Sequence, residues 1–281
     1  MKKNCRYFLY ILCFTFLLIG VTDCNSCKVF GSKLLQYDWF NYKVDDNGIT
    51  IISARTDIPE DYYYNNYPKV LTIPNKINGI KVVSAKPHLF KEGEYEYSDH
   101  PTGFTTIKCS DYMETVNLES FAEALYGFDS IETTIILGKY TRHFNQHNTT
   151  APWGNSYYFD TIKVPKNAAY LKAAKNGAVY TKDGKVLVAY PSKHRRKSLK
   201  ISSNTIEIED YAFDQAVIDT ITFPKSVKKI SVHAFEGFGP GYYGNTPTYH
   251  DGIVRVPKSK LKYYKKVFRN TKYFRGEIVT Y

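Results

Sequence analysis

Residues 199–213, "LKISSNTIEIEDYAF", and residues 221–235, "ITFPKSVKKISVHAF", are two copies of one pattern. They align without a gap at an offset of 22 residues, and both end in a small-aromatic pair, Ala212-Phe213 and Ala234-Phe235. A unit with one strand and one aromatic residue cannot bury its apolar face alone, so its copies must stack on one another. The pattern therefore predicts a repeat architecture.

Degenerate copies of the same strand recur across most of the chain. It consists of alternating or β-branched residues and is often closed by Pro-Lys or Pro-Asn. Alternate side chains of a strand point to opposite faces, so Ile221 and Phe223 point inward, whereas Thr220 and Thr222 point outward. Pro224 cannot donate to a strand ladder and ends the strand. We expect parallel strands, with Thr, Lys and Arg at outward positions, within residues 70–75, 105–109, 133–137, 161–166, 199–202, 220–225 and 253–258.

This unit resembles the BspA-like (Treponema-type) leucine-rich repeat, clearly at residues 199–235 and more loosely from about 68 to 268. The resemblance implies a β-rich repeat solenoid of short parallel strands with few short helices over residues 67–281. It also implies a hairpin insertion at 177–191 and strand-then-short-helix segments at 164–174 and 256–266. The second of these segments would open a C-terminal cap over residues 256–281.

Two turns predict β-hairpins independently of the resemblance. Asp183-Gly184 lies between two apolar runs inside the proposed insertion, and Asn47-Gly48 lies between two strand-like runs in residues 42–53. Both dipeptides favour the tight turns that join antiparallel strands. We interpret residues 24–66 as an N-terminal segment whose β-hairpin caps the open edge of the first repeat, since solenoids need capped ends for solubility.

Residues 1–23 have the features of an export signal. Lys2, Lys3 and Arg6 precede an apolar run of 15 residues at 7–21, whereas a membrane-spanning helix needs about 20. "VTDC" at 21–24 resembles a bacterial lipobox, which implies acylation of Cys24, although Asp23 stands where that motif normally has Gly, Ala or Ser. We expect an exported cell-surface or outer-membrane lipoprotein if Cys24 is acylated, and a secreted protein if it is not.

The exported chain keeps three cysteines, Cys24, Cys27 and Cys109. If Cys24 carries lipid, Cys27 and Cys109 can pair; if it does not, Cys24 and Cys27 can close a small loop. Three cysteines do not build a disulfide scaffold. "CNSC" at 24–27 also lacks the second pair that would complete a zinc site.

The composition indicates a folded, basic protein. Hydrophobic residues make up 43% of the 281 residues, which excludes a disordered chain. The formal charge of +11 falls to +9 without residues 1–23, which hold three basic residues and one acidic residue. A basic surface favours anionic partners. The basic runs at 193–197 and 258–275 lie in no recognisable nucleic-acid module, so we expect no nucleic-acid partner.

The sequence gives little indication of catalysis. We expect that the protein is not an enzyme and that it has no catalytic residue, metal or cofactor. His143 and His147 are four residues apart, but Phe144 stands where zinc enzymes of the familiar kind have Glu. No G-x-S-x-G motif and no glycine-rich phosphate loop occurs. Glu207 and Glu209 fall on alternate positions of one short segment, which predicts a shared, solvated face.

The resemblance implies a non-catalytic cell-surface binding or adhesion protein, which we expect to be a monomer that presents its repeat face to an extracellular protein or glycan. Tyrosine-rich segments at 62–67 and 95–97 suit contact surfaces. An alternative is a polysaccharide-binding accessory or carbohydrate-processing protein of the envelope, with loops 91–104 and 239–252 forming a sugar cleft. A third possibility is a structural envelope component. The sequence does not identify the ligand-binding residues.

Overall fold

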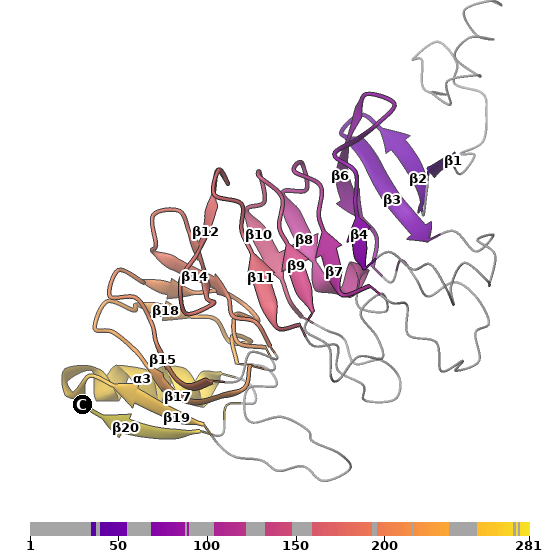
Figure 1. The fold of residues 1–281 in the computed structure, drawn as a ribbon. Coiled ribbons are helices and arrows are strands. Elements are labelled where there is room, and N and C mark those ends of the chain that lie inside the picture. Colours follow the sequence, from indigo (N-terminus) through magenta and orange to yellow (C-terminus); the bar gives the residue numbers. More distant parts are fainter. Residues whose placement is uncertain are drawn as a thin grey trace, which may run out of the picture.

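The computed structural model of the chain describes residues 35–37, 40–54, 69–87, 89, 104–121, 133–147, 159–192, 196–214, 216–235, 252–271, 274 and 276–281. These residues form a β-rich protein of short strands arranged in several separate sheets, with one α-helix in the described ranges (Figure 1). Strand β1 lies near one end of the molecule, and the helix and strand β20 lie at the other.

Two parallel ladders carry the repeated strands. The first has the order β11-β9-β7-β4, and the second has the order β15-β17-β19-β20. The strands of the first are β4 (Val70–Thr72), β7 (Thr106–Lys108), β9 (Thr134–Ile136) and β11 (Thr161–Lys163). The strands of the second are β15 (Arg196–Lys200), β17 (Ile218–Thr222), β19 (Ile253–Val256) and β20 (Glu277–Thr280). All seven strands predicted from the pattern are confirmed, and β20 is an eighth that the pattern did not predict.

Inward and outward positions follow the predicted alternation. The central apolar residues of neighbouring strands are register partners, as Leu199, Ile221 and Val254 show. These residues are 0–1% exposed. We call the segment from one ladder strand to the next a coil. Because the register is kept from one strand to the next, the central apolar residue of each coil is buried directly above that of the previous coil.

A second set of short strands lies outside the two ladders. Strands β8 (Thr115–Asn117) and β10 (His143–Asn145) pair in parallel, and the 3-10 helix η1 (Leu118–Ser120) follows β8. A five-stranded sheet has the order β12-β13-β14-β16-β18. Its strands are β12 (Leu171–Ala173), β13 (Val179–Thr181), β14 (Val186–Ala189), β16 (Glu207–Ile208) and β18 (Lys229–Ile230).

The insertion at 177–191 contains the predicted hairpin, since β13 and β14 pair antiparallel around Asp183-Gly184. The short helix predicted within 164–174 is wrong. Residues 171–173 form strand β12, which pairs antiparallel with β13. This tertiary pairing takes the backbone hydrogen bonds that a helix would have made internally.

The N-terminal hairpin is also confirmed. It belongs to a sheet with the order β1-β2-β3-β6-β5, whose strands are β1 (Leu35–Tyr37), β2 (Phe40–Asp45), β3 (Gly48–Ala54), β5 (Lys76–Ile77) and β6 (Ile80–Ala85). Asp45 closes the turn, because its carboxylate accepts hydrogen bonds from the backbone N–H groups of Asn47 (2.8 Å) and Gly48 (3.2 Å). Strand β3 then pairs in parallel with β6. The role of this hairpin as a cap stays a prediction.

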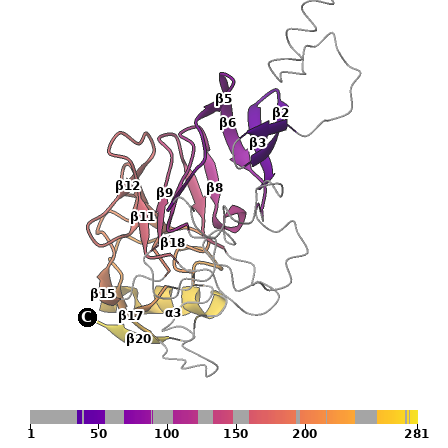
Figure 2. The same ribbon diagram turned by 45° about the vertical axis from the view of Figure 1, so that its right-hand side comes forward.

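The C-terminal segment contains the predicted helix. The 3-10 helix η3 (Lys258–Lys260) leads into α3 (Leu261–Asn270), which lies beside the second ladder in both views (Figures 1 and 2). Tyr264 and Phe268 are the buried residues of α3, and both contact Phe223 edge to face, with ring centroids 5.4 and 5.7 Å apart. The Tyr264 hydroxyl donates to the carbonyl of Pro224 (2.8 Å). The helix therefore packs directly on the coil that contains the second repeat copy.

Candidate binding surface

The outward side chains of the two ladders form aligned rows. In the first ladder Thr106, Thr134 and Thr161 are register partners. In the second ladder Ser198 and Thr220 are partners. We call these five residues the hydroxyl row. Their alignment follows from the kept register, which places side chains of the same kind side by side on adjacent strands.

A second row, two residues further along each strand, carries positive charge. Lys108 and Lys163 are both register partners of Ile136, and Lys200 and Arg255 are both partners of Thr222. We call Lys108, Lys163, Lys200 and Arg255 the cation row. Each pair is separated by one intervening strand, which corresponds to about 10 Å. All four residues are exposed, and no carboxylate in the described ranges forms an ion pair with them.

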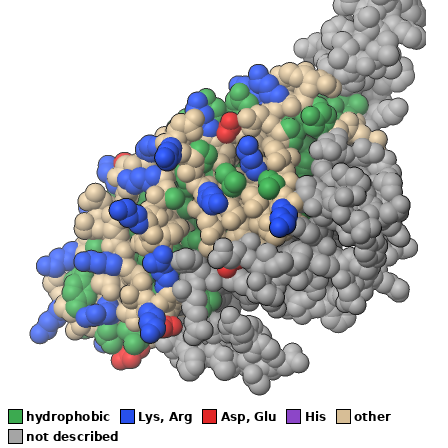
Figure 3. Space-filling view, in the orientation of Figure 1, with side chains coloured by type: hydrophobic (Ala, Val, Ile, Leu, Met, Phe, Trp, Pro, Cys, Tyr) green, Lys and Arg blue, Asp and Glu red, His purple; other side chains and the backbone are tan. Residues whose placement is uncertain are grey.

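The wider surface is basic as well. Figure 3 shows Lys and Arg side chains spread over the described part of the visible face, with few acidic side chains between them. The prediction that Thr, Lys and Arg occupy the outward strand positions is confirmed in part, because Val70, Ile136 and Ile253 also occupy such positions. An exposed face of this composition attracts anionic groups.

A hollow of about 560 Å³ lies where strands β17, β19 and β20 end. Its lining consists of Lys225, Pro257, Lys258, Ser259 and Tyr281. The Tyr281 hydroxyl donates to the carbonyl of Phe223 (2.8 Å), and the Lys258 N–H donates to the Tyr281 carbonyl (3.2 Å). These bonds hold Tyr281 to the ends of β17 and β19, and two lysines and a serine hydroxyl also line the hollow.

The turns after strands β7 and β9 form a second feature, which we call the turn ridge. The rings of Tyr112 and Tyr140 are stacked, with centroids 5.7 Å apart and planes 23° from parallel. The Lys81 ammonium lies 4.8 Å from the centroid of Tyr112, and the Lys139 ammonium lies 5.0 Å from that of Tyr140. Such cation–π contacts stabilise exposed sites by about 0.5–1 kcal/mol each.

Arg142 extends the turn ridge toward strand β12. Its guanidinium carbon lies 3.5 Å from the ring centroid of Tyr170, and a guanidinium nitrogen donates to the Tyr170 hydroxyl. The Nε atom lies 3.3 Å from a carboxylate oxygen of Glu114. Because Arg142 already contacts a ring and a carboxylate, it braces three consecutive coils, and we assign it a structural role.

The two histidines predicted at metal-like spacing have different surroundings. His143 is exposed on β10, whereas the His147 ring is stacked on Tyr211 at 4.0 Å, with its Nδ1 atom 3.9 Å from a buried carboxylate oxygen of Asp214. His233 stacks on the same tyrosine at 5.4 Å. His233 follows Tyr211 by 22 residues, the offset of the two pattern copies, so these rings stack at equivalent positions of successive copies. No group of three or more metal-ligating side chains occurs within the described residues.

The carboxylates predicted to share a solvated face are placed differently. Glu207 on β16 forms an ion pair with Lys229, its register partner on β18. Glu209 is partly buried, and this burial, reinforced by the nearby charges of Glu207 and Asp210, raises its pKa to about 7. The full solvation predicted for Glu209 is wrong, although its N–H continues the ladder by donating to the Leu187 carbonyl (3.0 Å).

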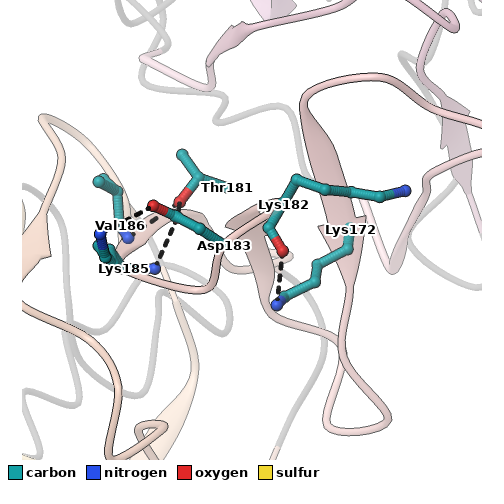
Figure 4. A network of polar contacts seen from close by, with 6 residues as sticks. All are labelled: Lys172, Thr181, Lys182, Asp183, Lys185 and Val186. Atoms are coloured by element: carbon teal, nitrogen blue, oxygen red, sulfur yellow. Dashed lines mark hydrogen bonds and ion pairs between the residues drawn. The ribbon is translucent and has the colours of Figure 1, made fainter.

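The hairpin insertion is fixed by its own polar network (Figure 4). One carboxylate oxygen of Asp183 accepts hydrogen bonds from the Thr181 hydroxyl (2.7 Å) and the Lys185 N–H (3.0 Å). Both bonds lower the pKa of Asp183, and the bond from the Lys185 backbone has the larger effect. The Lys172 ammonium donates to the carbonyl of Lys182 (2.8 Å). We therefore interpret Lys172 as part of the hairpin scaffold.

Cys109 is 3% exposed, and burial raises the pKa of its thiol to about 12. It forms no disulfide within the described residues. Several predicted features lie outside those residues: the signal at 1–23, Cys24, Cys27, the tyrosine-rich segments at 62–67 and 95–97, and all but one residue of each loop at 91–104 and 239–252. Among the residues that the structure describes, no helix has the length and apolar character needed to cross a membrane.

Comparison with known families supports the repeat pattern. Residues 189–240 match the family model of the BspA type leucine rich repeat region, which comprises six copies. The matched range contains both copies of the pattern at 199–235, and the predicted family resemblance is thereby confirmed. No curated protein shows significant similarity to the chain.

Three solved structures resemble the chain at low identity. A leucine-rich repeat protein from Eubacterium ventriosum ATCC 27560 is 14% identical with a TM-score of 0.38; the match covers 79% of this chain but 65% of that protein, slightly less than two thirds of its length. The pneumococcal vaccine antigen PcpA is 12% identical, with a TM-score of 0.30 and coverages of 89% and 99%. A leucine rich cell surface protein from Faecalibacterium prausnitzii A2-165 is 12% identical, with a TM-score of 0.34 and coverages of 81% and 89%.

Proposed function

We propose that this chain, whose residues 189–240 form a BspA-type leucine-rich repeat region, is a non-catalytic, monomeric binding protein of the cell surface. In this proposal the two parallel ladders belong to one repeat solenoid, and their outward rows contact an extracellular protein or glycan. Export depends on residues 1–23, and Cys24 is the site of a lipid anchor.

The observation that carries the proposal is the pair of outward rows, of which the cation row is exposed and the hydroxyl row is half-buried except at Ser198. A protein with only a structural role needs a buried side to its ladders but has no need of aligned hydroxyl and cation rows on the other side. The four residues of the cation row make no ion pair with the described carboxylates, so they remain available to a partner. Solenoids use such extended faces as binding surfaces.

The position of the protein in the cell is tested by mass spectrometry of its N-terminus from native cells. We expect the chain to begin at Cys24 with a diacyl- or triacyl-glyceryl group, and to be accessible to protease added to intact cells. If the protein is instead recovered from the medium with an unmodified N-terminus near residue 23, it is secreted and not anchored. Retention of residues 1–23 in a chain that protease cannot reach would overturn the surface role.

Binding is tested with the exported chain on arrays of immobilised extracellular-matrix proteins and glycans. The face variant is Lys200→Ala/Arg255→Ala, and the matched control is Lys43→Ala/Lys265→Ala, which removes the same charge from exposed positions on β2 and α3. We expect the face variant to lose most of the retained signal and the control to keep it. Absence of any retained ligand, or equal losses in both variants, would contradict the proposal.

A further inference from the structure

We propose that the second ladder and the hollow beside it bind a linear acidic polysaccharide, which crosses strands β15, β17 and β19. Its anionic groups contact Lys200, Arg255 and the two lysines of the hollow, Lys225 and Lys258. This inference rests on the proposed binding function and names the class of ligand. It assigns the site to one end of the molecule, where the ladder and the hollow adjoin.

Charge is divided along the strands of the second ladder. The exposed acidic residues, Asp219 on β17 and Glu277 on β20, lie toward the amino ends of their strands. Arg196 and Lys197 at the amino end of β15 balance these two acidic residues. Lys200 and Arg255 lie toward the carboxyl ends of their strands, and Lys225 and Lys258 line the hollow where β17 and β19 end. The charges named on the carboxyl-terminal side are therefore all positive, and an anionic chain is attracted to that side.

The spacing of the cations favours a polymer whose charges are spread out. Lys200 and Arg255 have Thr222 as their common register partner, so a neutral residue separates them. The separation of two strand steps, about 10 Å, is about the length of two sugar rings in an extended chain. A polysaccharide with one acidic group in each disaccharide fits this period, because successive anionic groups reach successive cations.

Hydroxyl groups lie where the neutral parts of such a ligand would be. Thr222 stands between the two cations, Ser198 and Thr220 form the adjacent hydroxyl row, and Ser259 lines the hollow. Each hydroxyl can both donate and accept a hydrogen bond, as sugar hydroxyls do. The surface thus offers charge to the acidic groups and hydrogen bonds to the remaining ring substituents.

The same rows suit other polyanions less well. None of the register-aligned outward residues of β15, β17 and β19 is aromatic. Single-stranded nucleic acids depend on aromatic rings on which their bases stack. Protein contacts likewise depend on aromatic anchors. Tyr281 contributes one ring at the edge of the hollow, which can cover one sugar ring but cannot make a stacking platform.

The test measures binding of the exported chain to hyaluronan oligosaccharides of defined length, which carry one carboxylate in each disaccharide, by calorimetry. Neutral dextran, inorganic polyphosphate and polyglutamate of similar length are the comparison probes. The site variant is Lys225→Ala/Lys258→Ala, and the control is Lys43→Ala/Lys265→Ala. We expect the site variant to weaken hyaluronan binding about tenfold or more, and the control to change it less than about twofold.

A second variant, Ser259→Ala, separates hydrogen bonding from charge. It leaves the charge unchanged, and we expect about a threefold to tenfold weakening of hyaluronan binding with no change for polyphosphate. Thermal unfolding of every variant checks that the fold is retained.

Four outcomes would overturn the inference. Equal weakening by the site and control variants would show a general effect of charge. Tighter binding of polyphosphate or polyglutamate, with the same loss in the site variant, would assign the hollow to a different anion. Failure to bind any acidic glycan, while a protein on the array is retained, would overturn this inference and leave the proposed function standing. If the chain binds none of the calorimetry probes and nothing on the array, both this inference and the proposed function are overturned.

Discussion

The rings of Phe213 and Phe235, 22 residues apart in the sequence, are stacked with centroids 5.0 Å apart and planes 17° from parallel. Both residues are fully buried, and the Phe213 N–H donates to the carbonyl of Ala234 (2.8 Å). The Ala-Phe pair that ends both copies of the pattern at 199–235 is therefore the contact between these two coils. This contact explains why the pair recurs at the same place.

Replacing Phe235 with Ala should lower the free energy of unfolding by about 3–5 kcal/mol, because it removes a buried ring and leaves a cavity. Urea unfolding at neutral pH measures this loss. Val232→Ala is the control, since Val232 lies in the same coil but is 48% exposed, and it should cost less than about 0.5 kcal/mol. Similar losses in the two variants would show that the stacked ring does not hold the coils together.

Gly138→Ala should be strongly destabilising, although the backbone of Gly138 is not left-handed. A Cβ atom there would lie 2.1 Å from the carbonyl oxygen of Ser110 and 2.9 Å from the Cα of Asp111, so the backbone of two coils must move apart. We expect a loss of about 3 kcal/mol or more in urea unfolding.

Gly79→Ala provides a matched control for that variant. Gly79 has a left-handed φ of +83°, but a Cβ atom added to it would meet no other part of the fold within 4 Å. Its substitution should therefore cost about 1 kcal/mol, from backbone strain alone. If Gly138→Ala costs no more than Gly79→Ala, the close approach of the two coils does not limit their packing.

Stability should fall as the pH rises through the titration of Glu209. Folding raises the pKa of this carboxyl from its ordinary value of 4.5 to about 7, chiefly by burial. The folded state therefore binds the proton more tightly, so stability declines between about pH 4.5 and pH 7 and the loss is complete above that range. After allowance for solvent screening, the loss is on the order of 2 kcal/mol.

Glu209→Gln should remove this pH dependence, because the amide stays neutral. We expect the variant to be more stable than the natural chain at pH 8 and similar to it at pH 4.5, as measured by thermal unfolding at both values. Glu277→Gln, at an exposed position on β20, serves as the control. A natural chain with equal stability at the two pH values would show that Glu209 ionises without cost.

The Cys109 thiol should be unreactive in the folded protein. It is buried, and its pKa of about 12 leaves almost no thiolate at neutral pH. We expect iodoacetamide to modify Cys109 only after denaturation, as followed by peptide mass spectrometry. Recovery of a Cys27–Cys109 disulfide from the native protein would contradict this expectation.

The strands and hairpins were predictable because their signals are local. Ile221 and Phe223 alternate with threonines within a few residues, and Asn47-Gly48 carries the turn chemistry of its own hairpin. Strand β12 was missed because its pairing with β13 decides its conformation. The partial burial of Glu209 was missed for a similar reason, since burial depends on segments far apart in the sequence, such as β14, whose Leu187 carbonyl accepts the Glu209 N–H.

The candidate binding surface was predictable only in outline. The alternation predicted outward Thr, Lys and Arg, but the register that aligns Lys200 with Arg255 across Thr222 is a relation between segments far apart in the sequence. The hollow needed the ends of three strands to meet around Lys225 and Lys258. The stack of Tyr112 on Tyr140 lies in coils that lack the Ala-Phe marker, so no aligned pattern pointed to it.

The parallel register of the ladders also governs how the protein responds to mechanical load. Leu199, Ile221 and Val254 lie one above another, so the ladder grows perpendicular to its strands, and a pull along that direction acts on the bonds between one coil and the next. Because each coil contacts mainly its neighbours, we expect tension to peel coils away one at a time. Single-molecule stretching should then show a series of small extensions, whereas one large rupture would indicate that the coils share the load.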